Sequence, residues 1–162
     1  MDKEKFWNDL KSGQFVSMVR ESSKGKKLVN SKEVFNVMKP MFADYPDIEV
    51  MYTVLLNARN RIMGIEKLAE GTISRISIYP RELVKLAIKN QATAVVLVHN
   101  HPSGDIEPSL EDRVITRTIW ISLYCIDVTL HDHIIVGDSY YSMADNGLIK
   151  RIRTDNEGLF QS

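Results

Sequence analysis

The sequence predicts an α/β fold in which a mixed β-sheet is flanked by helices. Residues 94–98 form an apolar run rich in β-branched side chains, which is typical of a central strand. Segments with helical spacing of apolar residues lie on both sides of this run, over 81–90 and 109–124. Strands and helices do not alternate strictly, so a mixed sheet is expected rather than a doubly wound parallel one.

The N-terminal part is expected to hold a peripheral segment, one helix and a β-hairpin. Ser31 is a candidate N-cap, and the apolar residues that follow it have helical spacing. Between residues 49 and 57, every second side chain is expected to point to the same face of a strand, and a hairpin-type turn follows. The predicted elements are a short helix near 3–11, a turn or mobile loop over 22–27, a helix over 31–42, strands over 49–57 and 61–68, and an extended piece over 73–78.

The C-terminal part is expected to supply the remaining strands and two helices. Pro80 suits a first helical turn, where its missing N–H is not needed. Ser109 is expected to start a long helix, and residues after 150 are polar and expected to fray. The predicted elements are helices over 81–90 and 109–124, strands over 94–98, 126–130 and 133–136, a turn over 137–139 and a short strand over 140–143. The inward stripe of the long helix is predicted as Val114, Ile115, Thr118, Ile119, Ser122 and Leu123.

Composition predicts one soluble cytoplasmic domain. The 162 residues include 21 Lys+Arg and 21 Asp+Glu, so the net charge of zero gives no overall attraction to nucleic acid or membrane. A single cysteine, Cys125, excludes an internal disulfide and fits a reducing compartment. No apolar run approaches the ~20 residues of a membrane span, and the charged N-terminus is unlike a signal peptide. Nothing in the sequence indicates an oligomeric state.

The segment VVLVHNHPSGDIEPSLED carries the clearest functional signal. His99 and His101 stand at i and i+2 at the end of the predicted strand, so both imidazoles can face one point. Asp112 lies one turn into the following helix and can reach back to them. Two imidazoles and one carboxylate, with a fourth position open, suit a catalytic Zn²⁺. A capping box between Ser109 and Asp112 is the structural alternative, and the two roles are compatible.

A metal-activated water requires a general base, and spacing alone does not choose one. The candidate glutamates are Glu49, Glu66, Glu70, Glu107 and Glu111. A second histidine pair, His131 and His133, lies in LHDHIIV and offers alternative ligands. Asp132 and His133 could instead form a hydrogen-bonded pair that orients the metal ligands, or serve structure at a strand end.

The pattern H-x-H-x7-S-x2-D, formed by His99, His101, Ser109 and Asp112, resembles the JAMM motif of the MPN/JAB metalloprotease superfamily. HNHPSGD, YPREL, EGT and DHIIVGD resemble its RadC-like (UPF0758) branch more closely. The resemblance covers about residues 30–150. It implies a cytidine-deaminase-like α/β/α sandwich over 31–150, between a peripheral segment 1–30 and a polar tail 151–162.

The resemblance also implies a zinc metallopeptidase or isopeptidase acting on a protein or peptide. By position in the family motif, Glu49 is the general base, Ser109 stabilises the oxyanion, and His99, His101 and Asp112 hold the metal. The alternative is a DNA-repair-associated accessory module with little or no peptidase activity; a metal-dependent nuclease is a weaker third option. RadC-like proteins usually carry a DNA-binding helix-hairpin-helix region, for which residues 1–30 are too short.

Overall fold

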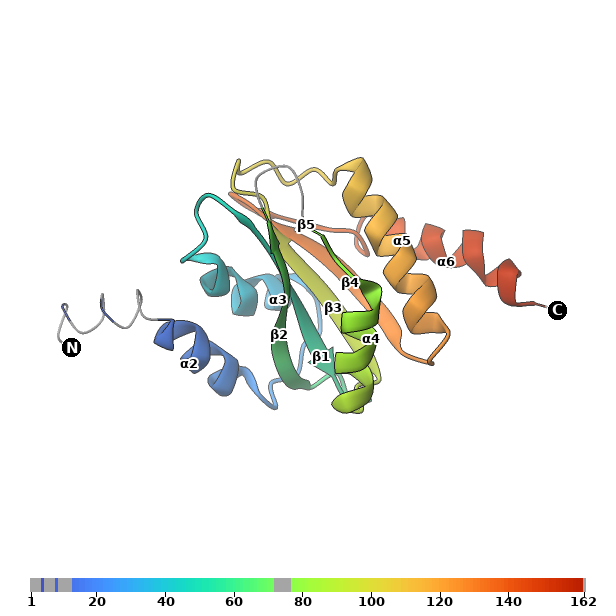
Figure 1. Cartoon of the computed structure of the whole chain (residues 1–162), viewed down its shortest axis with the longest axis horizontal. Coiled ribbons are helices and arrows are strands. Elements are labelled where there is room, and N and C mark those ends of the chain that lie inside the picture. Colours follow the sequence, from blue (N-terminus) through green and yellow to red (C-terminus); the bar gives the residue numbers. More distant parts are fainter. Residues whose placement is uncertain (1–3, 5–7, 9–12, 72–76, 162) are drawn as a thin grey trace.

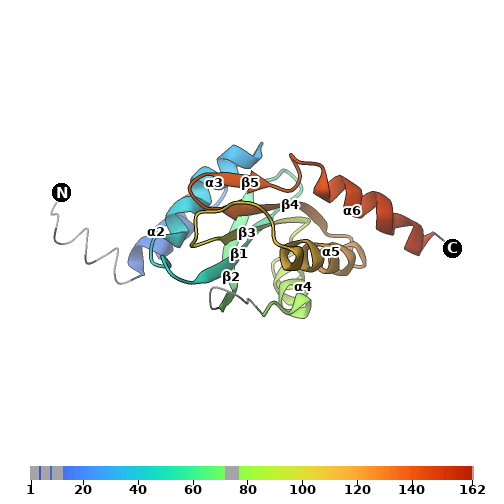
Figure 2. The same cartoon turned by 90° about the horizontal axis from the view of Figure 1, so that it is seen from above.

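The computed structural model describes residues 4, 8, 13–71 and 77–161 and shows one mixed sheet between two layers of helices (Figures 1 and 2). The sheet has five strands in the order β2-β1-β3-β4-β5. The elements are α2 (Gln14–Ser23), α3 (Ser31–Met38), η1 (Lys39–Phe42), β1 (Glu49–Leu56), β2 (Ile62–Gly71), α4 (Pro80–Lys89), β3 (Ala94–Asn100), α5 (Leu110–Tyr124), β4 (Thr129–Val136), β5 (Tyr140–Ser142), α6 (Leu148–Glu157) and η2 (Gly158–Phe160). The predicted α/β class is confirmed.

The predicted hairpin is present as β1 and β2, which pair antiparallel. Asn57 closes the turn, because its side-chain oxygen accepts hydrogen bonds from the backbone N–H groups of Arg59 and Arg61. β2 continues to Gly71, three residues further than predicted. Most of the extended piece expected over 73–78 lies outside the described residues, and its last two residues are not in a strand.

β3 is the central strand that the apolar run predicted, and all seven of its residues are buried. It pairs antiparallel with β1 and parallel with β4, and α5 forms the crossover between β3 and β4. The two strands predicted over 126–130 and 133–136 were wrong, because β4 is a single strand. A register shift opposite Val95 and Val96 leaves His131 without a partner residue in the ladder, so apolar alternation breaks there and the strand looks divided in the sequence.

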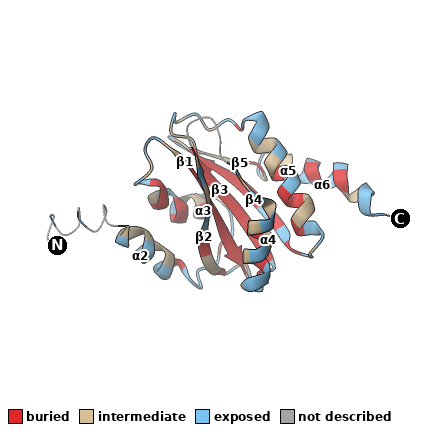
Figure 3. Cartoon of the chain, in the orientation of Figure 1, coloured by how far each residue is buried: buried red, intermediate tan, exposed pale blue. Residues whose placement is uncertain are grey.

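Two apolar cores lie on opposite faces of the sheet, and Figure 3 shows the buried strands between them. On one face, Val50, Tyr52 and Val98 pack against α3 and η1. On the other face, Met51, Leu97 and Ile135 pack against α4, α5 and α6. Alternating strand residues therefore enter different cores, as the pleat of a strand requires.

Helix positions were predicted better than helix faces. Pro80 does open α4, and Ser109 is the N-cap of α5. For α3, however, Asn30 rather than Ser31 is the N-cap, since its side chain accepts from the backbone N–H of Glu33. The inward stripe of α5 was predicted in part: Ile119 and Leu123 are buried as expected, but Val114 and Thr118 are exposed, and Thr116 and Trp120 are buried instead.

The ends of the chain are more helical than predicted. α2 occupies much of the segment expected to be peripheral, and the turn expected over 22–27 begins only after Ser23. The helix predicted near residues 3–11 falls almost wholly outside the described residues. The fraying expected after residue 150 is contradicted by α6, which buries Ile149, Ile152 and Asn156. In the described part of the chain, no helix combines the length and apolarity needed to cross a bilayer.

Candidate metal centre

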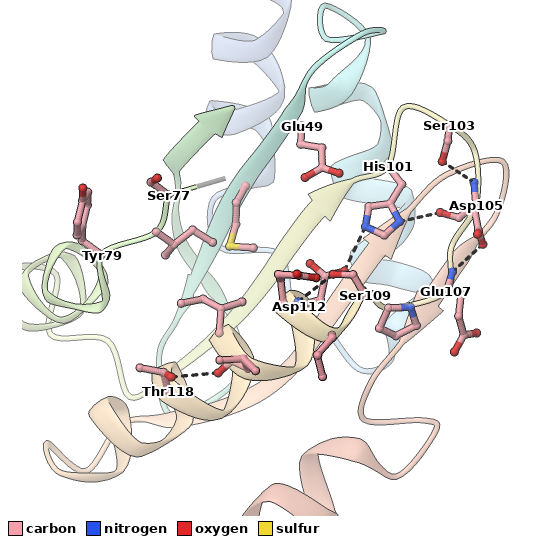
Figure 4. A pocket seen from close by; sticks show the side chains of 17 residues that line it. Glu49, Ser77, Tyr79, His101, Ser103, Asp105, Glu107, Ser109, Asp112 and Thr118 are labelled. Atoms are coloured by element: carbon pink, nitrogen blue, oxygen red, sulfur yellow. Dashed lines mark hydrogen bonds and ion pairs between the residues drawn. The ribbon is translucent and has the colours of Figure 1, made fainter. Parts of the chain in front are cut away.

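The predicted ligands and base meet at the edge of the sheet where β1 begins and β3 ends, and Figure 4 shows Glu49, His101 and Asp112 there. Met51 is paired with His99 across these antiparallel strands. Glu49 lies two residues before Met51 on β1, and His101 lies two residues after His99, just beyond the end of β3, so all four side chains belong to the same face. α5 packs on this face and brings Asp112 in its first turn to the same edge.

His99, His101 and Asp112 form a three-residue cluster that could hold a metal ion. The Nε2 atoms of the two imidazoles are 2.9 Å apart. Asp112 Oδ1 is 3.2 Å from His99 Nε2, and Asp112 Oδ2 is 3.3 Å from His101 Nε2. A tetrahedral Zn²⁺ with bonds of 2.0–2.2 Å separates its ligand atoms by about 3.3 Å, so the cluster has nearly the spacing that zinc needs.

The tautomer of His101 is fixed by a backbone carbonyl. His101 Nδ1 lies 2.7 Å from the carbonyl oxygen of Asp105, which can only accept, so Nδ1 carries the proton. In the neutral ring, Nε2 then has a lone pair directed at His99 and Asp112. A cation placed between these atoms would relieve the close approach of the two Nε2 atoms.

The loop after His101 is held against the turn that follows β4. The backbone N–H of His101 donates to the carbonyl of Val136 at 2.8 Å. Gly104 has a φ of +86°, and a Cβ there would lie 2.7 Å from a carboxylate oxygen of Asp138. Glycine is therefore required at this position for the loop to turn away from the strand end.

Asp112 caps α5 and also belongs to the cluster that could hold a metal. Ser109 and Asp112 form a capping box: the Ser109 N–H donates to Asp112 Oδ2 at 2.9 Å, and Ser109 Oγ accepts from the Asp112 N–H at 3.0 Å. The same carboxylate faces the two imidazoles. The cap thus fixes the direction of the carboxylate, and Ser109 itself lines the pocket.

Burial and hydrogen bonding oppose each other in setting the charges of this cluster. Burial favours the neutral form of Asp112, but its close contacts with the His101 and His99 imidazoles hold its pKa well below the usual range. Burial also disfavours protonated His101, but Asp112 and the Asp105 carbonyl raise the pKa of His101 above its usual value. The carboxylate therefore remains ionised and offers a negative charge to the cluster.

Glu49 lines the same pocket and is held there by Asn100. Asn100 is buried, and its side-chain oxygen accepts from the backbone N–H of Val50 at 2.7 Å. Its amide group donates to the carbonyls of Tyr45 and Ile48, so one side chain anchors the chain on both sides of Glu49. Burial raises the pKa of Glu49, and the two imidazoles of the cluster partly oppose this.

The other candidate bases are less well placed. Glu66 and Glu70 lie on β2, outside the residues that line the pocket, and Glu70 pairs with Lys67. Glu107 and Glu111 line the pocket but are exposed, and Glu107 pairs with Arg113 at 3.3 Å. Glu49 is the only one of the five that combines partial burial, a strand position and a place in the pocket.

The second histidine pair is split between two regions. His131 contacts the side chain of Asn60 at the opposite end of the sheet. His133 is fully buried, and its Nε2 lies 2.7 Å from His99 Nδ1. Asp132 and His133 do form a hydrogen bond, but through the backbone N–H of His133 rather than its ring: the Asp132 carboxylate accepts from the backbone N–H groups of His133 and Ala144 and from the Ser142 hydroxyl. Asp132 therefore stabilises the β4–β5 region, while His133 contacts the cluster.

Thr116 and Asn100 are the contributors that the sequence did not identify. Thr116 Oγ1 lies 2.6 Å from His133 Nδ1, behind the metal cluster. Thr116 lies four residues after Asp112 and therefore on the same helix face, and this spacing is the sequence feature that could have identified it. The anchoring role of Asn100 had no comparable signal, because its partners are backbone groups about 50 residues away.

The cluster opens into a pocket of about 900 Å³ between the strand ends and α5. Figure 4 shows Glu49, His101, Ser109 and Asp112 facing this space. The rest of the lining includes the apolar side chains Met51, Ile78, Leu110, Val114 and Ile115, together with Ser77, Tyr79 and Thr118. The site thus joins a polar, acidic centre to an apolar groove.

The chain is similar to proteins of one family throughout this region. Residues 28–148 match the family model described as RadC-like JAB domain. A UPF0758 protein from Thioalkalivibrio sulfidiphilus is 39% identical over 127 residues, which are 78% of this chain and 56% of that protein. A UPF0758 protein from Symbiobacterium thermophilum is 42% identical over 123 residues, covering 75% of this chain and 52% of the relative.

A third relative, a UPF0758 protein from Variovorax paradoxus, is 50% identical over 103 residues, covering 62% of this chain and 45% of its own length. The chain therefore spans about half the length of the curated relatives it matches. The names of these relatives state no activity.

Proposed function

The chain belongs to the RadC-like JAB domain family, and from this premise we propose that it is a zinc-dependent amide hydrolase of the metallopeptidase or isopeptidase kind. The observation that carries the proposal is the convergence of His99, His101 and Asp112 at a pocket that Glu49 also lines. A His₂-carboxylate set that leaves a fourth position open is a known catalytic arrangement for zinc.

The protein would hold the metal through His99 Nε2, His101 Nε2 and the Asp112 carboxylate. When bound, Zn²⁺ supplies a Lewis acid and lowers the pKa of water from about 15.7 to about 7. The Asp105 carbonyl holds His101 in the ligating tautomer, and the Ser109 cap orients Asp112. These contacts prearrange the ligands before the metal arrives.

Glu49 would act as the general base and then as the general acid. Its carboxylate accepts a proton from the attacking water and delivers it to the departing amine. Because burial raises the pKa of Glu49, a transfer in both directions near neutral pH is easier than for an exposed carboxylate. Anchoring by Asn100 keeps this carboxylate on the pocket side.

Ser109 would donate to the oxygen of the substrate carbonyl as negative charge develops there. Its oxygen already accepts from the Asp112 N–H, so its only proton is available to the substrate. One such donor contributes about 3 kcal/mol to the transition state. The apolar groove along α5 would receive a side chain of the protein or peptide next to the bond that is cut.

The test is a peptide-library cleavage assay with the full chain loaded with one equivalent of Zn²⁺. We expect metal-dependent cleavage that a chelator abolishes and added zinc restores. Absence of cleavage by protein that holds a full equivalent of zinc would contradict the proposal. A parallel incubation with plasmid tests the two alternatives. A DNA-binding accessory module would bind the plasmid in a salt-dependent way, and a nuclease would cleave it.

Zinc binding is expected to release protons and to weaken as the pH falls. Burial opposes protonation of His101, but its hydrogen-bond partners raise its pKa. In the metal-free protein, a larger fraction of this ring is therefore protonated near neutral pH than for an ordinary histidine. Only the neutral imidazole can ligate zinc. Titration calorimetry in buffers of different ionisation enthalpy should give a released-proton count that is larger at about pH 6 than at about pH 8. A count that does not change with pH would contradict this assignment.

A further inference from the structure

A buried chain of polar groups connects His99 to the first turn of α5. His99 Nδ1 is 2.7 Å from His133 Nε2, and His133 Nδ1 is 2.6 Å from Thr116 Oγ1. Thr116 Oγ1 is in turn 2.5 Å from the backbone carbonyl oxygen of Asp112. The side chains of His99, His133 and Thr116 are fully buried. The chain thus returns to Asp112, whose carboxylate faces His99 from the other side.

The last contact of this chain gives it a direction. A backbone carbonyl only accepts, and two oxygens at 2.5 Å repel unless a proton lies between them, so Thr116 donates to Asp112. The threonine hydroxyl has a single proton, so it must accept from His133 Nδ1. In neutral His133 the Nε2 atom then has no proton and accepts from His99 Nδ1. Met143 Sδ, 3.4 Å from Thr116 Oγ1, is a weak acceptor and does not compete with the carbonyl.

We propose that Thr116 and His133 are positioning residues that hold His99 in the tautomer with its proton on Nδ1, so that Nε2 is free to bind the metal. This inference rests on the proposed function for its metal-binding consequence. The reverse direction would put a proton on His99 Nε2 and two lone pairs between Thr116 and Asp112. Partners of this kind commonly change metal affinity by about 10- to 100-fold when they are removed.

The arrangement also links the two elements that supply the ligands. His99 comes from β3 and Asp112 from α5, and the chain through His133 on β4 ties them together behind the site. Thr116 is one helical turn beyond Asp112, so two successive turns on one face of α5 hold the carboxylate and the terminal hydroxyl. The separation of the ligands is therefore fixed before metal binds.

Thr116→Val is the direct test, because valine keeps the shape of threonine and removes the hydroxyl. We expect its dissociation constant for Zn²⁺, measured by chelator competition, to rise by about 10- to 100-fold. Thr116→Ser should bind close to wild type, since it restores the hydroxyl. Thr154→Val is the matched control: Thr154 makes the same contact with a carbonyl four residues earlier, but on the exposed face of α6. A Thr116→Val affinity equal to that of Thr154→Val would overturn the proposal.

A second measurement separates this inference from the proposed function. Long-range ¹H–¹⁵N correlation spectra of the imidazoles, recorded on wild type with and without Zn²⁺, report which nitrogen of His133 carries the proton. We expect Nδ1 in both states. A proton on Nε2 would overturn the proposed direction even if zinc binds. If wild type binds no zinc, the proposed function fails, whereas the spectrum without metal still decides the direction of the chain.

Discussion

Glu49→Gln is expected to abolish amide hydrolysis while the protein retains its zinc. Glutamine has nearly the shape of glutamate but cannot accept and return a proton, so the loss should reach about 10²- to 10⁴-fold in kcat. Glu49 is not one of the three clustered ligands, and its backbone remains anchored by Asn100. Turnover of a cleaved peptide and zinc content by elemental analysis should be measured on the same preparation.

Glu70→Gln provides the matched control for this substitution. Glu70 lies on the neighbouring strand β2, pairs with Lys67 and is exposed, so its loss should leave turnover and zinc content unchanged. Hydrolysis by Glu49→Gln at nearly the wild-type rate would remove Glu49 from the mechanism. Loss of zinc from Glu49→Gln would show instead that this carboxylate supports the metal.

His101→Ala is expected to abolish stable zinc binding and, with it, hydrolysis. The substitution removes one of three ligands, so its effect should exceed the about 10- to 100-fold change typical of an outer hydrogen-bond partner. The imidazole is partly accessible and lies in a loop, so the fold should survive its truncation. Equilibrium dialysis against Zn²⁺ followed by elemental analysis measures the change.

His131→Ala is the appropriate comparison, because it removes an imidazole from the opposite end of the sheet. His131 contacts Asn60 and no member of the metal cluster. This variant should bind one equivalent of zinc. A full equivalent of tightly bound zinc in His101→Ala would show that His101 is not a ligand, and His131 and His133 would then have to be tested as ligands.

The sequence predicted the centre of the fold and the grouping of the site because both depend on local patterns. Apolar β-branched residues before His99 indicated a buried strand, and Ser109 with Asp112 indicated a helix start. Side-chain alternation then placed His99 and His101 on one face. Glu49 was different, because spacing left five glutamates open and only the family resemblance selected it.

The remaining features depend on contacts that local patterns do not contain. Because of the register shift in β4, the sequence pattern did not indicate one continuous strand. His131, at the shift, is exposed, whereas His133 is buried. The order of His133, Thr116 and Asp112 around the site arises from packing α5 on the sheet. α6 was missed because its few apolar residues are buried by tertiary packing in an otherwise polar segment.

The most direct test of the account is a crystal structure of the zinc-loaded protein with anomalous data at the zinc absorption edge. One strong peak is expected at about 2.0–2.2 Å from the Nε2 atoms of His99 and His101 and from the Asp112 carboxylate. The pocket that contains Glu49 should adjoin the fourth position of the metal. A peak elsewhere, or none between these three side chains, would contradict the proposed metal centre.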